Sequence, residues 1–284
     1  MILVTGGTGT VGRQVVGRLP ADLPVRIMAR DPARVTGAAA TAETVAGDYG
    51  DPRSLARALA GVRAAFLVTT RVGGDDDARF LRAAEMAGVQ RVVKLSAAAV
   101  LDGQAGDLIT RWQRAGEELL CASGLEWTLL RPRAFMSNCL SWAASVRAEG
   151  TVRALYGQSA HACVDPADVA EVAVRALVEE GHAQRAYTLT GPQALTAAEQ
   201  ARQLGELLGV ALRFEELSAG QARAALAGRY PAPVVEALLQ SAGRLRAGAK
   251  AGVQDTVRRV TGREAGTFRA WAQAHLAAFG PLPA

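Results

Sequence analysis

The sequence predicts an α/β fold in which a doubly wound parallel sheet is followed by a smaller, mainly helical C-terminal region. Three observations predict it. Short β-branched apolar runs alternate with amphipathic helical stretches from residue 1 to about residue 150. A glycine-rich segment follows the first of these runs directly. After residue 150 the alternation weakens and the sequence becomes predominantly helical.

The alternating region contains six candidate strands, each a short run rich in apolar residues. They span residues 2–5, 25–29, 44–46, 64–69, 91–95 and 127–130. Five candidate helices span residues 11–19, 52–60, 75–87, 108–122 and 135–149, several of them entered through Asp or Pro and left through Gly. Right-handed crossovers would stack these units into one sheet, with a ligand crevice at the carboxyl ends of the strands.

The second half of the chain predicts a return to the sheet and then a cap. Residues 151–195 contain candidate strands at 152–156 and 186–189 and a helix at 166–179. Residues 196–284 contain amphipathic stretches at 197–208, 219–227, 233–245 and 268–279. The expected organisation is a sheet domain of residues 1–150, with returns from 151–195, and a helical cap of residues 196–284 that contributes to the substrate pocket.

Composition excludes several classes of protein. No run approaches the roughly eighteen apolar residues of a membrane span, and the N-terminus carries no leader, so we expect a cytoplasmic protein. Cys121, Cys139 and Cys163 lie far apart without C-x-x-C spacing, which favours reduced thiols over a metal site. The net charge of +5 comes from scattered arginines and predicts no nucleic-acid partner.

The strongest motif is T-G-x-x-G-x-x-G between Thr5 and Gly12, placed directly after a strand and before a helix. This context is typical of a Rossmann-type dinucleotide loop. Gly6 allows the tight turn, Gly9 lets the backbone approach the pyrophosphate, and Gly12 allows close packing of helix on strand. The predicted cofactor-binding residues of the loop are Gly6, Thr8, Gly9, Thr10, Val11 and Gly12. A purely structural glycine turn is the alternative.

A cofactor selector is expected where the second strand ends, about twenty residues beyond the glycines. Arg30 occupies that position, and Arg34 follows it. A basic side chain there pairs with the 2′-phosphate of NADP, whereas an acidic one would bind the ribose hydroxyl of NAD. The sequence therefore favours NADPH, unless both arginines are simply solvated turn residues.

Further segments extend the pattern along the chain. They are Gly47-Asp-Tyr49 and residues 92–96, 123–132, 135–138, 164–170 and 255–262. With the glycine loop, they make essentially the whole chain resemble the NmrA-like branch of the atypical short-chain dehydrogenases/reductases. That family includes NADPH-dependent quinone reductases and NADP-sensing regulators.

The resemblance implies positions for further cofactor-binding residues. Asp48 and Tyr49 would lie beside the adenine, Val68, Thr69 and Thr70 under the adenosine-side ribose and pyrophosphate, and Pro132 and Phe135 beside the nicotinamide. Ser96 would face the nicotinamide end. Two structural alternatives remain open, because Asp48 could cap the following helix and Phe135 could belong to the core.

One departure from the family bears on the chemistry. Hydride-transferring relatives usually hold a Tyr and, four residues later, a Lys on the helix before Glu117, where this chain has Ile109 and Gln113. General acid catalysis typically supplies about 10²–10⁴ in rate. Without that pair, conjugated acceptors are favoured, because conjugation delocalises the anion that hydride addition leaves.

The remaining candidates complete the predicted pocket. Ser96, Gln113 and His161 are the candidate catalytic residues, although a lone His is often a structural residue. Trp112, Met136 and Asn138 are the candidate substrate-binding residues. We expect an NADPH-dependent reductase of a quinone or conjugated carbonyl compound, including aromatic polyketide-like compounds of secondary metabolism. It would act on a small molecule as a monomer or homodimer. A non-catalytic NADP(H) sensor and an epimerase or isomerase that uses NADP transiently are the alternatives.

Overall fold

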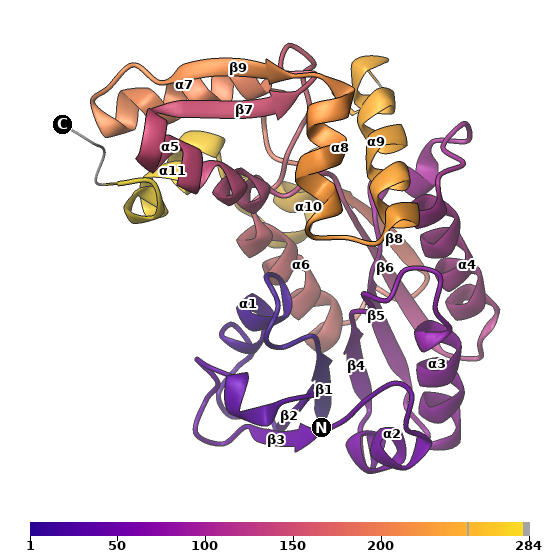
Figure 1. Ribbon diagram of the computed structural model, residues 1–284. Helices are drawn as coiled ribbons and strands as arrows, with labels where there is room; N and C mark the ends of the chain where they lie inside the picture. The colour runs from indigo at the N-terminus through magenta and orange to yellow at the C-terminus, as the bar shows by residue number, and fades with distance from the viewer. Residues whose placement is uncertain (249, 281–284) are drawn as a thin grey trace.

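The computed structural model describes residues 1–248 and 250–280. Its centre is a seven-stranded sheet in the order β3-β2-β1-β4-β5-β6-β8, in which every neighbouring pair is parallel (Figure 1). The strands are β1 (Ile2–Thr5), β2 (Val25–Ala29), β3 (Glu43–Ala46), β4 (Ala64–Leu67), β5 (Arg91–Leu95), β6 (Glu126–Pro132) and β8 (Arg185–Leu189). The reversal of strand order between β1 and β4 is the topological switch point of a Rossmann-type sheet, which confirms the predicted fold class.

The sheet is buried on both faces, because successive side chains of a strand point to opposite sides. In β1, Leu3 belongs to one core cluster and Val4 to the other. The same alternation recurs in β4, where Ala65 and Phe66 divide between the two clusters. Strands that are buried on both faces need continuous apolar runs. Such runs are visible in the sequence, which is why the central strands could be predicted.

Helices cover the two faces. The helices α1 (Gly12–Val16) and α6 (Pro166–Val178) pack together on one face, where α10 (Thr256–Thr261) joins α6. The helices α2 (Pro52–Leu59), α3 (Asp76–Met86) and α4 (Leu108–Ala122) follow one another across the other face. Helix starts follow the predicted chemistry: the carboxylates of Asp51, Asp107 and Asp165 accept from amides in the first turns of α2, α4 and α6.

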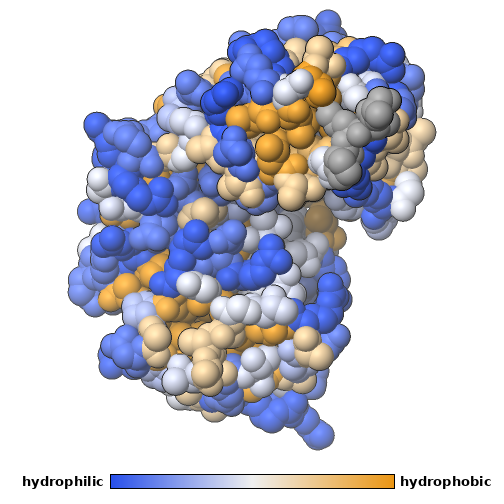
Figure 2. Space-filling model, turned by 90° about the vertical axis from the view of Figure 1, so that its left-hand side faces the viewer, coloured by the Kyte–Doolittle hydropathy of each residue, from blue (hydrophilic) through white to orange (hydrophobic). Residues whose placement is uncertain are grey.

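The C-terminal part has its own core and its own small sheet. The strands β7 (Thr151–Leu155) and β9 (Arg213–Leu217) pair in parallel, and the helices around them are α5 (Ala143–Glu149), α7 (Ala197–Leu208), α8 (Ala219–Ala227), α9 (Ala232–Arg246) and α11 (Phe268–Ala274). Figure 2 shows a patch of apolar residues on this upper mass and further apolar areas on the lower one. Met136, Phe268 and Trp271 belong to its buried cluster.

One sequence-based expectation for this region needs correction. The strand expected at 152–156 does not return to the main sheet, because β7 pairs with β9. The segment 196–284 is mainly helical, as predicted; it also contains β9, and its helix α10 packs on α6 of the sheet domain. In β9 the polar sequence Arg-Phe-Glu-Glu-Leu hides the strand, because only its pairing with β7 stabilises it.

Within residues 1–248 and 250–280, no helix is both long and apolar enough to cross a membrane. The same residues contain no group of three or more His, Cys, Asp or Glu side chains arranged to hold a metal ion.

Candidate functional site

A cavity of about 360 Å³ lies where β1, β2 and β4 end, at the switch point of the sheet. Eight of the predicted cofactor-binding residues line it: Gly6, Thr8, Gly9, Arg30, Asp48, Tyr49, Val68 and Thr70. Met28, Gly47, Arg71 and Asp76 also line it and were not among the predicted residues. Segments up to 70 residues apart in the sequence thus converge on one pocket.

The glycine loop forms one wall of this cavity. Gly6 adopts a left-handed φ of +65°, and the Gly9 amide donates to the Gly6 carbonyl oxygen at 2.8 Å. Gly9 is exposed, and a Cβ on it would lie 3.2 Å from that oxygen, with no closer contact. The loop is therefore closed on the protein side and open toward the cavity.

The role predicted for Gly12 belongs to its loop neighbour Gly7 in the structure. A Cβ on Gly12 would overlap the carbonyl group of Gly6, so Gly12 approaches its own loop and not a strand. The close contact with a strand belongs to Gly7, whose Cβ would lie 2.6 Å from Cγ2 of Ile27 in β2. Both contacts keep the loop pressed against the sheet.

The other two loop candidates lie at the start of α1. Val11 is buried in the core with its side chain 3% exposed, so only its backbone could meet a ligand. Thr10 is exposed but does not line the cavity. In the described part of the chain, the amides of both residues have no backbone acceptor, so two N–H groups at the start of α1 are free to meet a ligand.

Arg30 and Arg34 separate in the structure. Arg30 follows β2 directly, is exposed and lines the cavity, with no ion pair to any described carboxylate. Arg34 ends a short 3₁₀ turn (Pro32–Arg34) and lies outside the lining residues. The Asp31 carboxylate accepts from the Ala33 amide and starts that turn. Of the two arginines, Arg30 alone is placed at the cavity.

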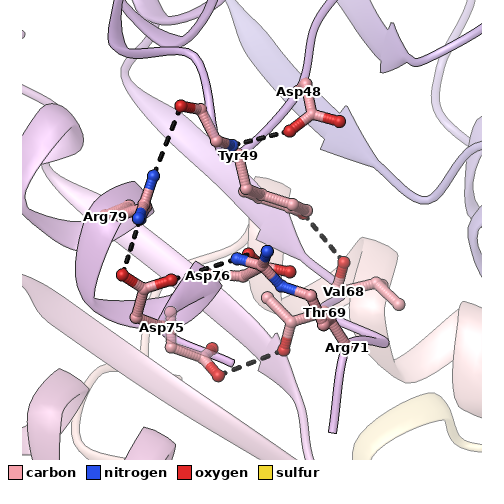
Figure 3. A network of polar contacts seen from close by, with 10 residues as sticks. Asp48, Tyr49, Val68, Thr69, Arg71, Asp75, Asp76 and Arg79 are labelled. Atoms are coloured by element: carbon pink, nitrogen blue, oxygen red, sulfur yellow. Dashed lines mark hydrogen bonds and ion pairs between the residues drawn. The ribbon is translucent and has the colours of Figure 1, made fainter. Parts of the chain in front are cut away.

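The far end of the cavity is built around Tyr49, shown with its neighbours in Figure 3. The Tyr49 hydroxyl donates to the Val68 carbonyl oxygen at 2.8 Å, and its ring stands edge-on to Phe80. Burial raises the pKa of the Tyr49 hydroxyl, so this group stays neutral. Asp48 accepts from the Gly50 amide at 2.6 Å, so it caps a turn before α2 and not α2 itself.

A charged network borders Tyr49 and was not predicted. Arg71 pairs with Asp75 and Asp76, and Arg79 donates to Asp75 at 2.7 Å and to the Gly50 carbonyl oxygen (Figure 3). Thr69 turns away from the cavity, because its hydroxyl donates to the buried Asp77 at 3.1 Å. Polar residues directly after β4 were the sequence signal for this network.

Ser96 sits at the end of β5 within a buried polar triad. Its hydroxyl donates to Glu117 of α4 at 2.5 Å, and Arg131 of β6 binds both oxygens of the same carboxylate at 2.9 and 2.5 Å. Glu117 and Arg131 were not predicted as site residues. The triad locks the adjacent ends of β5 and β6 to α4.

A second cavity, of about 190 Å³, lies between the segment after β6 and the C-terminal part. Phe135, Asn138 and His161 line it, together with Trp142, Tyr156 and Leu245. Met136 does not: its side chain is 2% exposed and packs in the C-terminal core. Pro132 is the last residue of β6 and is buried beside this region.

Four buried side-chain polar atoms have no hydrogen-bond partner in the described chain. They are Trp112 Nε1, Gln113 Oε1, Arg133 Nε and His161 Nδ1. Gln113 lies one helical turn before Glu117 on α4, so the two residues share one face of that helix. Buried polar groups are normally satisfied, so each of these atoms is a candidate for meeting a ligand.

Comparison with known proteins supports this geometry. Residues 6–180 match the family model described as NAD(P)H-binding. The chain is 55% identical over 281 residues to a (4-alkanoyl-5-oxo-2,5-dihydrofuran-3-yl)methyl phosphate reductase of Streptomyces griseus subsp. griseus, covering 99% of this chain and 100% of the relative. An NAD(P)H azoreductase of Xenophilus azovorans is 38% identical over 288 residues, with 99% of each chain covered.

The solved structures agree. The NADPH complex of the quinone oxidoreductase QOR2 of Escherichia coli superposes with a TM-score of 0.84 at 28% identity, covering 98% of this chain and 100% of that one. These findings confirm the expectation of an enzyme that uses NADPH as an oxidoreductase. The chain belongs to the NAD(P)H-binding family, in its NmrA-like branch of atypical short-chain dehydrogenases/reductases.

Proposed function

We propose that this protein reduces a carbon–carbon double bond conjugated to carbonyl groups, with NADPH as the reductant and a phosphorylated butenolide as the substrate class. The observation that carries the proposal is the absence of the Tyr and Lys acid pair, whose positions on α4 hold Ile109 and Gln113. The Streptomyces griseus relative is named for the reduction of such a butenolide phosphate.

The residues at the switch point suit a dinucleotide. A cavity of about 360 Å³, a glycine loop open toward it and an exposed, unpaired Arg30 provide room, backbone donors and a cation. Gly9, Thr10 and Val11 would hold the pyrophosphate, Tyr49 and Asp48 would border the adenine, and Arg30 would bind the 2′-phosphate. When bound, NADPH supplies a hydride from its nicotinamide ring.

A butenolide with a second acyl group needs little help from an acid. Hydride addition to its β-carbon moves the double-bond electrons onto two carbonyl oxygens, which share the charge of the resulting enolate. A proton from water then completes the reaction at the α-carbon. By contrast, a saturated ketone becomes a localised alkoxide, for which a positioned acid contributes about 10²–10⁴ in rate.

The chain's own polar groups suit the task of orienting such a substrate. The Ser96 hydroxyl is held by Glu117, so the serine offers its oxygen in a fixed position and not a free proton. Burial, followed by the nearby positive charge of Lys250, lowers the pKa of His161, so its ring is neutral at pH 7. A neutral imidazole donates a hydrogen bond without acting as a strong acid.

The first test is a panel of acceptors. With saturating NADPH, we expect kcat/KM for conjugated butenolides and enones to exceed that for matched saturated ketones by at least about 100-fold. This is the lower end of the rate factor that general acid catalysis contributes. The double variant Ile109→Tyr/Gln113→Lys should narrow that gap. Comparable turnover of both acceptor classes by the unmodified protein would contradict the proposal. Tight NADPH binding without any turnover would favour the sensor.

A second test concerns the cofactor. Because Arg30 is exposed at the cavity and unpaired, Arg30→Ala should reduce the preference for NADPH over NADH by about 10- to 100-fold, the equivalent of one charge-assisted hydrogen bond. Dissociation constants from fluorescence titration measure the ratio. Arg34→Ala is the matched control, since Arg34 lies outside the cavity lining. Equal loss in both variants would argue against Arg30 as the selector.

A further inference from the structure

Three basic side chains come from segments that border the second cavity, and among the described residues none of them forms an ion pair with a carboxylate. Arg133 directly follows β6, and its buried Nε has no hydrogen-bond acceptor in the described chain. Nearby arginines are satisfied: Arg131 binds Glu117, and Arg114 donates to the carbonyl oxygens of Val100, Asp102 and Ala105. Unlike Arg131 and Arg114, Arg133 therefore has no acceptor for its guanidinium group among the described residues.

Lys250 is the second member. Its carbonyl oxygen accepts from the Ala162 amide at 3.1 Å, which places it next to His161. Its ammonium group donates to the Ser241 hydroxyl at 2.8 Å and forms no ion pair among the described residues. Burial lowers the pKa of Lys250; the nearby Asp107 carboxylate opposes this shift, and the charge of Arg133 adds to it.

His161 is the third member. Its ring lines the second cavity, and its buried Nδ1 has no partner in the described chain. The positive charge of Lys250 lies close enough to contribute to lowering the pKa of His161. His161 lines the cavity, Arg133 directly precedes the lining residue Ala134, and the Lys250 backbone is hydrogen-bonded to the residue after His161. The three therefore form a basic cluster beside the cavity, in which Arg133 and His161 each keep one buried nitrogen without a partner in the described chain.

The acidic groups of this neighbourhood are already engaged. Asp102 accepts from Arg244 through Nε at 2.7 Å and also through Nη2. Asp107 caps α4 by accepting from the amide and the hydroxyl of Thr110. Positive charges that share a partly buried site without a direct counter-ion are costly, and an anionic ligand would relieve that cost.

We propose that Arg133, Lys250 and His161 form an anion subsite that binds the phosphate monoester of the substrate. The inference rests on the proposed function, because it assigns a place to the substrate's phosphate while the unsaturated ring occupies the adjoining cavity. Arg133 offers several N–H donors to phosphate oxygens, Lys250 a point charge, and neutral His161 one N–H donor. The subsite would fix the orientation of the substrate, with the phosphate at the basic cluster and the unsaturated ring in the cavity.

Binding to the NADP⁺-loaded protein tests the subsite without requiring turnover. Calorimetry would compare a short-chain butenolide methyl phosphate with its dephosphorylated alcohol. We expect the unmodified protein to prefer the phosphate, and Arg133→Met and Lys250→Met each to reduce that preference by about 10- to 100-fold. Arg223→Met is the matched control, since it removes one positive charge from an exposed arginine that pairs with Glu236.

The outcomes separate the possible failures. An undiminished phosphate preference in both variants would overturn the subsite, even if conjugated acceptors are reduced as proposed. A tenfold weaker affinity for NADPH in Arg133→Met, with the phosphate preference intact, would assign that residue to the cofactor and also overturn it. Phosphate-selective binding lost in both variants, but without any reduction, would support the subsite and contradict the proposed reaction.

Discussion

Replacing Gly9 by valine should abolish NADPH binding while leaving the protein folded. A Cβ at this position would lie 3.2 Å from the Gly6 carbonyl oxygen and otherwise face the open cavity, so only the loop has to shift slightly to admit it. The pyrophosphate could then no longer approach the loop. Losing two charge-assisted hydrogen bonds between the loop and the pyrophosphate costs about 3–6 kcal/mol. The dissociation constant for NADPH should then rise by roughly 10²- to 10⁴-fold.

The same substitution elsewhere on this segment supplies the control. Gly17 follows α1, is exposed, and a Cβ on it would meet only the Arg13 carbonyl oxygen at 3.6 Å and the Gly37 oxygen at 4.0 Å. Gly17→Val should therefore retain NADPH affinity in fluorescence titration. Circular dichroism would confirm that both variants are folded. Undiminished affinity in folded Gly9→Val would show that the loop does not hold the cofactor.

Gly12 would be a poorer choice for this experiment. Its Cβ would overlap the Gly6 carbonyl group, so any side chain there displaces the loop before a ligand is present. The sequence motif treats Gly9 and Gly12 alike as members of T-G-x-x-G-x-x-G. Only the structure distinguishes the glycine that faces the ligand from the one that faces the protein.

The sheet was predictable from sequence because its strands are buried on both faces. The bounds of β1, β2 and β5 agree with the predicted runs, and α4, α7 and α8 begin and end where their amphipathic patterns do. Such elements carry their signal locally, in apolar runs and in capping residues. The strand β9 has no such signal, because its stability depends on β7, sixty residues earlier.

The site was predictable where it consists of backbone and sequence neighbours. The glycine loop was predicted from its motif between a strand and a helix, and Arg30 from its distance beyond the glycines, and both border the cavity. Side-chain partnerships were not predictable, because Glu117 and Arg131 meet Ser96 only through the packing of α4 against two strands. The burial of Met136 escaped prediction for a similar reason: a helical pattern does not say which core an apolar residue joins.

Behind the cavity, β5 and α3 are joined by a buried ion pair that sequence reasoning did not identify. Lys94 Nζ lies 2.6 Å from Asp77 Oδ1, and their side chains are 0% and 4% exposed. Thr69 donates to the other carboxylate oxygen of Asp77. Gly116 of α4 leaves room for the pair, because a Cβ there would lie 2.9 Å from Asp77 Oδ2 and 3.1 Å from Lys94 Cε.

Removing the cation alone should severely destabilise the protein. Lys94→Met leaves Asp77 buried without its counter-ion, and breaking such a pair typically costs about 3–5 kcal/mol. Urea denaturation would measure the loss in free energy of unfolding. The double variant Lys94→Met/Asp77→Leu should recover most of it, because an apolar pair removes the uncompensated charge as well as the attraction.

A surface pair calibrates the measurement. Arg153 binds Glu149 and Glu215 but is about a third exposed, so Arg153→Met should cost no more than about 1 kcal/mol. If Lys94→Met costs as little as Arg153→Met, the buried pair is not a stabilising link between β5 and α3. If the double variant is no more stable than Lys94→Met, the cost lies in lost packing around the lysine stem and not in a stranded carboxylate.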